Sequence, residues 1–198
     1  MNLFLRHRFT YAVICGIGFG SLAGLQVQAA STPSQVSDWT SESYLVNESN
    51  VDFELPTNWI STEDLFGIPL TFLGPEDSDG RAVVLVSPLR VPEWKFTPAM
   101  QDQFYTEYQA GRKASAEAEG RVIESFDPLM SETWKSGAQA YCMGYRSGFL
   151  NQTFIERSCY VFCHDFLYHI KSLIRGSQET KYGKTVESVT KSFGCGGE

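Results

Sequence analysis

Hydrophobic and polar residues alternate along the first part of the chain with the period of two that is typical of half-buried β-strands. Residues 51–55 and 68–73 show this alternation. Residues 82–86 form a continuous apolar run, which indicates a strand covered on both faces. A Gly-Pro pair and an acidic turn, within 74–80, separate the last two segments. This part of the chain therefore predicts three strands joined by turns.

Two later segments show the period of a helix instead. The first, 97–119, begins with a Thr-Pro pair, a common helix start, and places apolar residues on one face from Met100 to Tyr108. The second follows Ser177 and ends at a glycine. Its apolar stripe consists of Tyr182, Val186, Val189 and Phe193.

The segment between the two helices predicts further strands. A strand over 122–126 is expected to end at Asp127-Pro128, because proline cannot donate a hydrogen bond to a neighbouring strand. Segments 138–146, 153–163 and 166–175 follow with short turns and indicate an antiparallel meander. The whole order predicts an α+β domain in which a central antiparallel sheet is flanked by helices.

The features in this order resemble the PsbP-like superfamily, which includes the DcrB-type bacterial proteins and the Ran-binding Mog family. The resemblance covers about residues 43–195. It rests on the strand that ends at Trp59, the two paired strands, the first helix, the Gly137-Ala138-Gln139-Ala140 start of the meander and the last helix ending Lys191-Ser192-Phe193.

This resemblance implies an α/β/α sandwich around a central antiparallel sheet. It also implies a binding, assembly or chaperone-like protein, with no catalytic residues to carry over. The cysteines are not part of the family pattern. The chain is therefore expected to be a non-enzymatic binding protein that recognises a protein partner and needs no cofactor.

The N-terminus has the pattern of a secretory signal peptide. Arg6, His7 and Arg8 precede an apolar run, and Val27-Gln28-Ala29 forms a small-residue cleavage site. Residues 1–29 are therefore expected to be a signal peptide, followed by a flexible lead-in over 30–42 and one domain over 43–198. The apolar run is short and glycine-rich, so we expect no lasting membrane anchor and a periplasmic or secreted protein.

The charge of the chain argues against a nucleic-acid partner. The formal net charge is −7, with 16 Lys and Arg against 23 Asp and Glu. The signal peptide holds two of the basic residues and no acidic ones, so the mature chain carries 14 − 23 = −9. Nucleic-acid binding requires a surplus of basic residues to neutralise phosphates.

Four cysteines remain after the signal peptide, and an even number in an oxidising compartment suggests two disulfides. A turn centred on Leu150-Asn151 would place Cys142 opposite Cys159 on one face. Cys163 would then pair with Cys195, although the sequence allows three pairings. The alternative is a metal site, because Cys159, Cys163 and His164 lie close together with His169 nearby.

Other chemistry is weakly indicated. No Gly-x-Ser-x-Gly motif is present, so a hydrolase would have to use His164 or His169 in a cleft. The turn Asp77-Ser78-Asp79-Gly80 has calcium-binding residue types but lacks the ligands that complete a calcium loop. Binding of a small molecule or a metal ion is the alternative function. Tryptophans near predicted loops, which either mark a binding surface or close the edge of the core, are Trp39, Trp59, Trp94 and Trp134.

Mass spectrometry of the exported protein under non-reducing conditions tests both expectations about processing. The mature chain should begin at Ala30, and its mass should be lower than that of the reduced chain by the four hydrogens that two disulfides remove. Four free thiols, or an intact leader, would contradict these expectations.

Overall fold

The computed structural model describes residues 39–89, 98–163 and 166–196. They belong to the second of two compact units, 1–35 and 36–198. Described elements in chain order are β1 (Trp39–Val46), β2 (Ser49–Pro56), β3 (Ile60–Leu65), β4 (Ile68–Leu73), β5 (Val83–Leu89), α1 (Pro98–Ala118), β6 (Val122–Thr133), β7 (Gln139–Phe149), β8 (Gln152–Cys163), β9 (Phe166–Arg175), the 3-10 turn η1 (Gly176–Gln178), α2 (Glu179–Lys191) and β10 (Gly194–Cys195).

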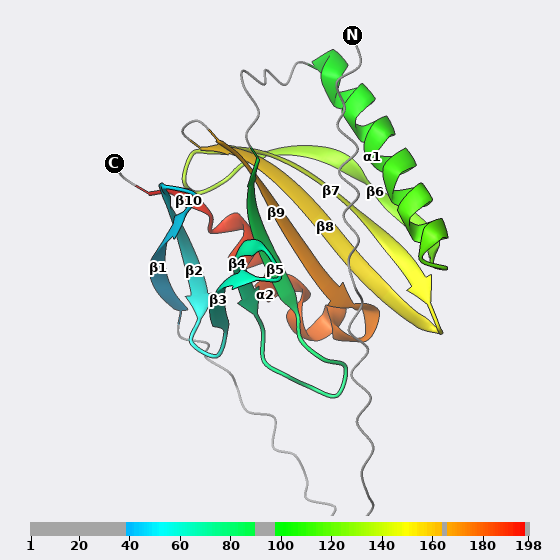
Figure 1. The fold of residues 1–198 in the computed structure, drawn as a ribbon, viewed down its shortest axis with the longest axis horizontal. Helices are drawn as coiled ribbons and strands as arrows, with labels where there is room; N and C mark the ends of the chain where they lie inside the picture. The colour runs from blue at the N-terminus through cyan, green and yellow to red at the C-terminus, as the bar shows by residue number, and fades with distance from the viewer. Residues whose placement is uncertain (1–38, 90–97, 164–165, 197–198) are drawn as a thin grey trace, which may run out of the picture. The chain divides into compact units, whose positions relative to one another are not determined.

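Most of the fold is antiparallel sheet, as the alternating pattern predicts (Figure 1). Seven strands lie in the order β3-β4-β5-β9-β8-β7-β6. The meander β7-β8-β9 has the expected strands, and the two-residue turn Leu150-Asn151 sets the register that places Cys142 opposite Cys159. Strand β1 begins at Trp39, so its first residues fall within the segment expected to be a flexible lead-in.

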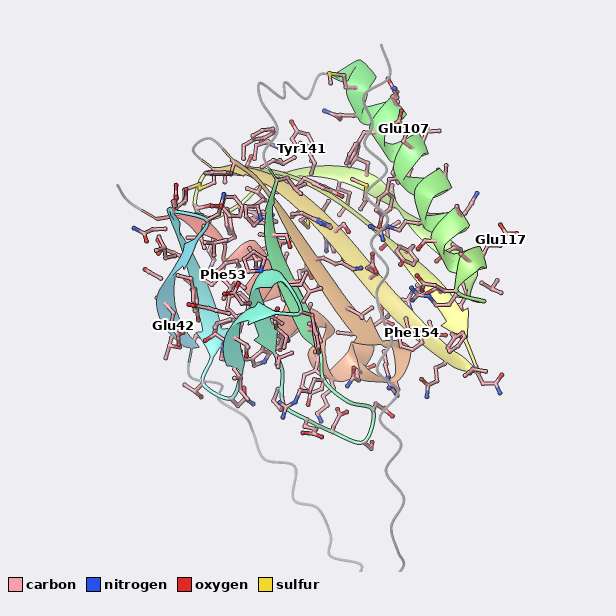
Figure 2. All side chains as sticks on the ribbon, in the orientation of Figure 1. Glu42, Phe53, Glu107, Glu117, Tyr141 and Phe154 are labelled. Atoms are coloured by element: carbon pink, nitrogen blue, oxygen red, sulfur yellow. A yellow bond between two sulfur atoms is a disulfide. The ribbon has the colours of Figure 1, made fainter. Side chains whose placement is uncertain are left out.

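A second sheet changes the expected architecture of a single central sheet. Strand β2 pairs with β1 on one side and with the short β10 on the other, which makes a separate three-stranded sheet. Phe53 of β2 is buried and packs edge-on against Phe72 of β4 and Phe193, so aromatic side chains join the two sheets (Figure 2). Strand β10 comes from the end of the chain, and short-range periodicity cannot show this pairing.

The prediction that a strand ends at Asp127-Pro128 was wrong. Strand β6 continues to Thr133, and its register against β7 shifts between Asp127 and Met130. Strand β6 is the edge of the seven-stranded sheet. A proline is tolerated at a bulge in an edge strand, because its missing N–H faces no partner there.

The two helices contact different elements and lie against opposite faces of the large sheet. Helix α1 packs on β6, whereas α2 packs on β9 and β5 (Figure 1). On β7, Cys142 belongs to the main core that includes α2, and the next residue, Met143, belongs to the smaller core that includes Tyr108 of α1. Consecutive residues of a strand face opposite sides, so these two cores form separate layers. Within the described residues, neither helix is long and apolar enough to cross a membrane.

Two disulfides connect the four cysteines. Cys142–Cys159 joins β7 to β8 within the core, and Cys163–Cys195 joins the end of β8 to β10. Strand β10 belongs to the small sheet, so the second disulfide links the two sheets covalently. The two pairs lie 17 and 32 residues apart in sequence.

Removal of either disulfide should lower the free energy of unfolding. Removal of the disulfide that closes the longer loop should lower it more. Replacing Cys142 and Cys159 together with alanine should cost about 3 kcal/mol, and replacing Cys163 and Cys195 together should cost about 4 kcal/mol, because a longer loop restricts the unfolded chain more. Urea unfolding of the two double variants and the wild type measures the differences. Unchanged unfolding midpoints in both double variants would contradict this role.

Candidate functional site

One histidine of the proposed hydrolase lies in the described structure. His169 is on β9, and its Nε2 lies 3.0 Å from the Ser158 hydroxyl oxygen on β8. The ring of Tyr160 stacks on the imidazole with 4.6 Å between ring centroids. His164, the other candidate, lies outside the described residues. The structure therefore brings a serine and a histidine together, as nucleophilic catalysis would require.

A buried carboxylate lies on the same side of the sheet. Glu156 of β8 is 3% exposed, and three side chains from three other elements surround it. The Lys171 Nζ atom lies 2.6 Å from its carboxylate, the Tyr145 hydroxyl donates a hydrogen bond of 3.0 Å, and Arg112 of α1 lies at 3.5 Å. We call Glu156, Lys171, Tyr145 and Arg112 the Glu156 cluster. A buried charge is costly unless it is paired, and this cluster supplies the pairing.

The electrostatics around His169 disfavour a catalytic role. Burial, together with the positive charges of Lys171 and Arg112, lowers the pKa of His169 to about 3. An imidazole with so low a pKa is a weak general base near neutral pH. Ser158 is fully buried, so a substrate cannot reach its hydroxyl without a movement of the chain. The Ser158–His169 pair therefore has the character of a structural contact.

The candidate metal ligands also have other partners. All four cysteines of the domain are in disulfides, and a disulfide sulfur is not the thiolate that zinc binds. In the acidic turn, Asp77 accepts hydrogen bonds from Gln178 and Lys181, and Asp79 accepts one from Ser177. The turn thus fastens to the start of the last helix. Across residues 39–89, 98–163 and 166–196, no three His, Cys, Asp or Glu side chains are grouped as metal ligands.

A hollow of about 410 Å³ lies on the other face of the sheet, between α2 and strands β6 to β9. We call it the α2 hollow. Its apolar lining includes Ile155, Ile174 and Val186, and charged residues from α2 and the strands complete it. Volumes of this size are common for sites that bind small molecules. The charged lining residues are Asp127, Arg146, Arg157, Glu179, Lys184, Glu187 and Lys191.

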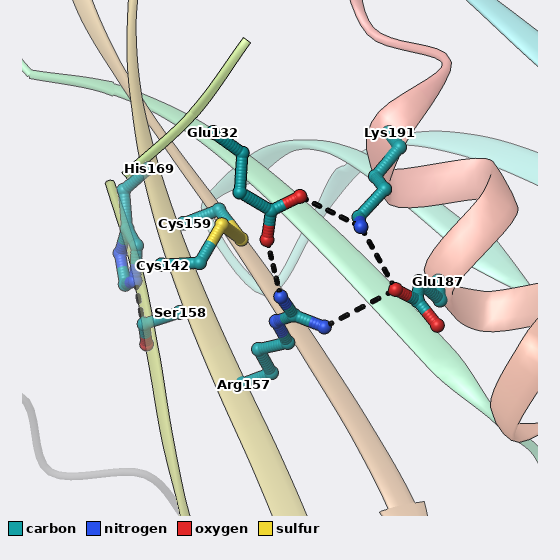
Figure 3. Close-up of a disulfide and its surroundings, with 8 residues drawn as sticks. All are labelled: Glu132, Cys142, Arg157, Ser158, Cys159, His169, Glu187 and Lys191. Carbon is teal, nitrogen blue, oxygen red and sulfur yellow. Dashed lines mark hydrogen bonds and ion pairs between the residues drawn. A yellow bond between two sulfur atoms is a disulfide. The ribbon is translucent and has the colours of Figure 1, made fainter. Parts of the chain in front are cut away.

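Three residues of an ion network line the α2 hollow. Figure 3 shows the network. Arg157 contacts Glu132 at 2.7 Å and Glu187 at 3.6 Å. Lys191 contacts the same two carboxylates, at 2.6 and 2.9 Å. Two cations and two anions from β6, β8 and α2 thus form a closed, neutral set that fixes the helix over the sheet. The pKa of Glu187 is lowered by its hydrogen bond to Lys191.

A glycine in the middle of α2 leaves this hollow open. Gly183 lines the hollow, and a Cβ atom added there would meet nothing closer than the Glu179 Cγ at 3.7 Å. Glycine within a helix costs about 0.5–1 kcal/mol relative to alanine. Neither the backbone angle nor crowding requires glycine at this position. The effect of Gly183 is that no side chain of the helix fills the space above the apolar lining.

Two hairpin turns expose large apolar residues in a backbone conformation that such residues rarely adopt. Leu150 has a φ of 47° and is 78% exposed, and Phe66 has a φ of 53° and is 81% exposed. Both occupy the first position of a two-residue turn, where asparagine, aspartate or glycine is preferred. The residue pattern predicts the turn at Leu150 but does not predict the exposure of its side chain. The sequence signal that could have indicated this exposure is a leucine at a turn position where asparagine, aspartate or glycine is preferred.

Exposure differs widely among the tryptophans. Trp59 and Trp134 are buried and belong to the main core, so they close its edge. Trp39, at the start of β1, is the most exposed of the three tryptophans in the described residues. Trp94 lies outside the described residues. The tryptophans therefore indicate a binding surface less clearly than Leu150 and Phe66 do.

Comparison with known proteins identifies the fold. No protein-family model matches the chain, and no curated protein matches it. Among solved structures, PsbP (CyanoP) from Synechocystis sp. PCC 6803 aligns with a TM-score of 0.54 at 13% identity, over 86% of this chain and 99% of that one. PA94 from Pseudomonas aeruginosa aligns with a TM-score of 0.42 at 13% identity, over 77% and 94%. LpqN from Mycobacterium tuberculosis is described as involved in cell envelope biogenesis. It aligns with a TM-score of 0.42 at 11% identity, over 82% of this chain and 86% of that one.

The likeness to CyanoP shows that the chain has a PsbP-like fold, as the sequence resemblance implies. At this level of identity the likeness concerns the backbone arrangement and not the function. What the domain does has to be argued from its own surfaces.

Protonation of His169 provides a test of the interior beneath α1. Its pKa is about 3 in the folded chain, against an ordinary value of 6.5. As the pH falls below about 6.5, the unfolded chain gains a proton at this residue that the folded chain does not. The contribution of His169 to the free energy of unfolding is therefore complete above pH 6.5. It decreases as the pH falls from 6.5 to about 3.

NMR of the imidazole protons should show a neutral ring from pH 8 to pH 4. Stability should decrease less steeply between pH 6.5 and 4 in the variant His169→Gln than in the wild type, because glutamine does not titrate. A ring that titrates near pH 6.5 in the folded protein would show that His169 is accessible and charged.

Proposed function

We propose that this chain is an exported, non-enzymatic binding protein of PsbP-like fold that recognises a protein partner. The exposed leucine at the strained turn of the β7–β8 hairpin is the observation that carries the proposal. The family resemblance adds to it, since such proteins are expected to bind or to assist assembly. The CyanoP-like backbone is compatible with this role.

Support for export comes from the sequence and the sulfur chemistry together. The N-terminal segment has the residue pattern of a signal peptide, and the domain contains two disulfides. Disulfides persist in oxidising compartments and are rare in the cytosol. A periplasmic or secreted protein fits both observations.

The absence of catalysis is supported by the state of the residues that would perform it. His169 has a pKa of about 3, and burial keeps its partner Ser158 away from solvent. A hydrolase needs a base that accepts a proton near the working pH and a nucleophile that meets the substrate. This pair lacks both properties.

Leu150 has the properties of an anchor for a partner protein. A left-handed conformation costs an L-residue with a Cβ atom about 1–2 kcal/mol, and an exposed leucine regains nothing by packing within its own chain. Strain that persists without internal compensation is a common feature of functional positions. Val122 starts β6 opposite Gly148, close to the same hairpin end, and it too is exposed.

A polar hollow adjoins this hairpin end. It measures about 500 Å³, and its lining includes Asn151 and Gln152 of the hairpin together with Arg146 and Arg175. An apolar anchor beside polar and charged groups is the usual composition of a protein interface, in which the centre is apolar and the rim is wet. The partner should therefore present an apolar pocket for Leu150, rimmed by polar groups.

Site-specific photo-crosslinking in the exported fraction of the native cells tests the proposal. A photoreactive amino acid at position 150 should give one adduct of constant mass. The same amino acid at Glu117, which lies on the side of α1 away from the sheet, should give none (Figure 2). No adduct at position 150, or equal adducts at both positions, would overturn the proposal.

Leu150→Asn should separate folding from binding. Asparagine is favoured at this turn position, so the variant should raise the free energy of unfolding by about 1 kcal/mol while it no longer competes for the partner in the crosslinking assay. The matched variant Phe66→Asn should be stabilised in the same way and should still compete. A Leu150→Asn protein that is less stable than the wild type and still competes would assign Leu150 a structural role.

A further inference from the structure

The α2 hollow lies next to the polar hollow at the hairpin end and shares Arg146 with it, but its other lining residues differ. Its lining combines aliphatic side chains at its base with charged side chains from β6, β7, β8 and α2. Ile155, Ile174 and Val186 supply the aliphatic surface. An apolar base with a few polar groups around it is the usual composition of a site for a small molecule.

Gly183 and Thr190 provide space and an unsatisfied hydrogen-bonding group for an occupant. Gly183 removes a side chain from the helix surface directly over the hollow, although a Cβ atom would fit there. Thr190 lines the same hollow and is 3% exposed, and its hydroxyl oxygen has no hydrogen-bond partner. A buried hydroxyl without a partner is costly, and a ligand atom in the hollow would satisfy it.

The charges that line the hollow specify the ligand. Arg157, Lys191 and Glu187 belong to the closed ion network, and Arg146 pairs with Glu179. The other two charged residues that line the hollow are Lys184 and Asp127. Neither forms an ion pair with another side chain of the described residues, and both are exposed at the hollow. One unpaired cation and one unpaired carboxylate complement a ligand that carries both charges.

We propose that the α2 hollow binds a zwitterion with an apolar body, of the class of hydrophobic α-amino acids and short apolar peptides. The ligand carboxylate pairs with Lys184, and the ligand ammonium pairs with Asp127. The apolar side chain lies on Ile155, Ile174 and Val186.

Titration of the mature, disulfide-bonded protein tests the proposal directly. L-Leucine, L-phenylalanine and the dipeptide Phe-Leu are added separately while amide NMR signals and calorimetric heats are recorded. At least one of these probes should bind saturably and shift the signals of Gly183 and Thr190. Tighter binding of the dipeptide would indicate peptides as the source, and tighter binding of a single amino acid would indicate free amino acids.

Each ligand charge can be removed in turn. N-acetyl-leucine lacks the ammonium and leucinamide lacks the carboxylate, and each should bind about tenfold more weakly than leucine, which corresponds to about 1.4 kcal/mol. If N-acetyl-leucine bound as tightly as leucine, the site would be an anion site and the proposal would be wrong.

Surface substitutions complete the test without disturbing the core. Lys184→Met and Asp127→Asn should each weaken binding about tenfold. The control Lys181→Met alters a lysine of the same helix that pairs with Asp77 and should leave binding unchanged. Gly183→Leu should fill the hollow and abolish binding. No saturable binding of any of the three probes, or binding that survives both Lys184→Met and Asp127→Asn, would overturn the proposal. Crosslinking at Leu150 does not depend on this result.

Discussion

The alternation of side chains along β8 is the constraint on which both layers of the domain depend. Because neighbouring residues of a strand point to opposite faces, Cys159 and Tyr160 lie in different layers. Cys159 joins Cys142 in the core beneath α2, whereas Tyr160 stacks on His169 on the side of α1. A register shift of one residue would move Glu156 into the apolar core and separate the two cysteines. The disulfide and the buried carboxylate therefore select the same register.

The Glu156 cluster explains how a charged face can lie in the interior. A carboxylate that leaves water loses several kcal/mol of hydration, and paired charges and hydrogen bonds must replace that hydration. Lys171, Tyr145 and Arg112 provide this replacement from β9, β7 and α1. Arg112 also ties α1 to the sheet, so the position of the helix depends on the cluster. Burial and the same positive charges keep His169 neutral, which makes it a weak general base in its contact with Ser158.

The two faces of the large sheet therefore differ in what they can do. Beneath α1, the carboxylate of Glu156 is buried and paired with Lys171 and Arg112. Beside α2, a glycine in the helix and an unpartnered hydroxyl leave space for a ligand. The hairpin end adds an exposed leucine in a strained conformation. The proposed binding function rests on these surface features.

The sequence by itself determined the meander β7-β8-β9, both helices and the position of the turn at Leu150-Asn151, because these depend on local periodicity and turn preference. It placed Cys142 opposite Cys159 for the same reason. It did not determine the second sheet, since β10 reaches β2 from the other end of the chain, nor the bulge that lets Pro128 lie within β6. The Glu156 cluster and the α2 hollow were decided by tertiary structure alone. Each collects residues from at least three elements, and no spacing along the chain encodes distances between elements that meet only when the sheet and helices have packed.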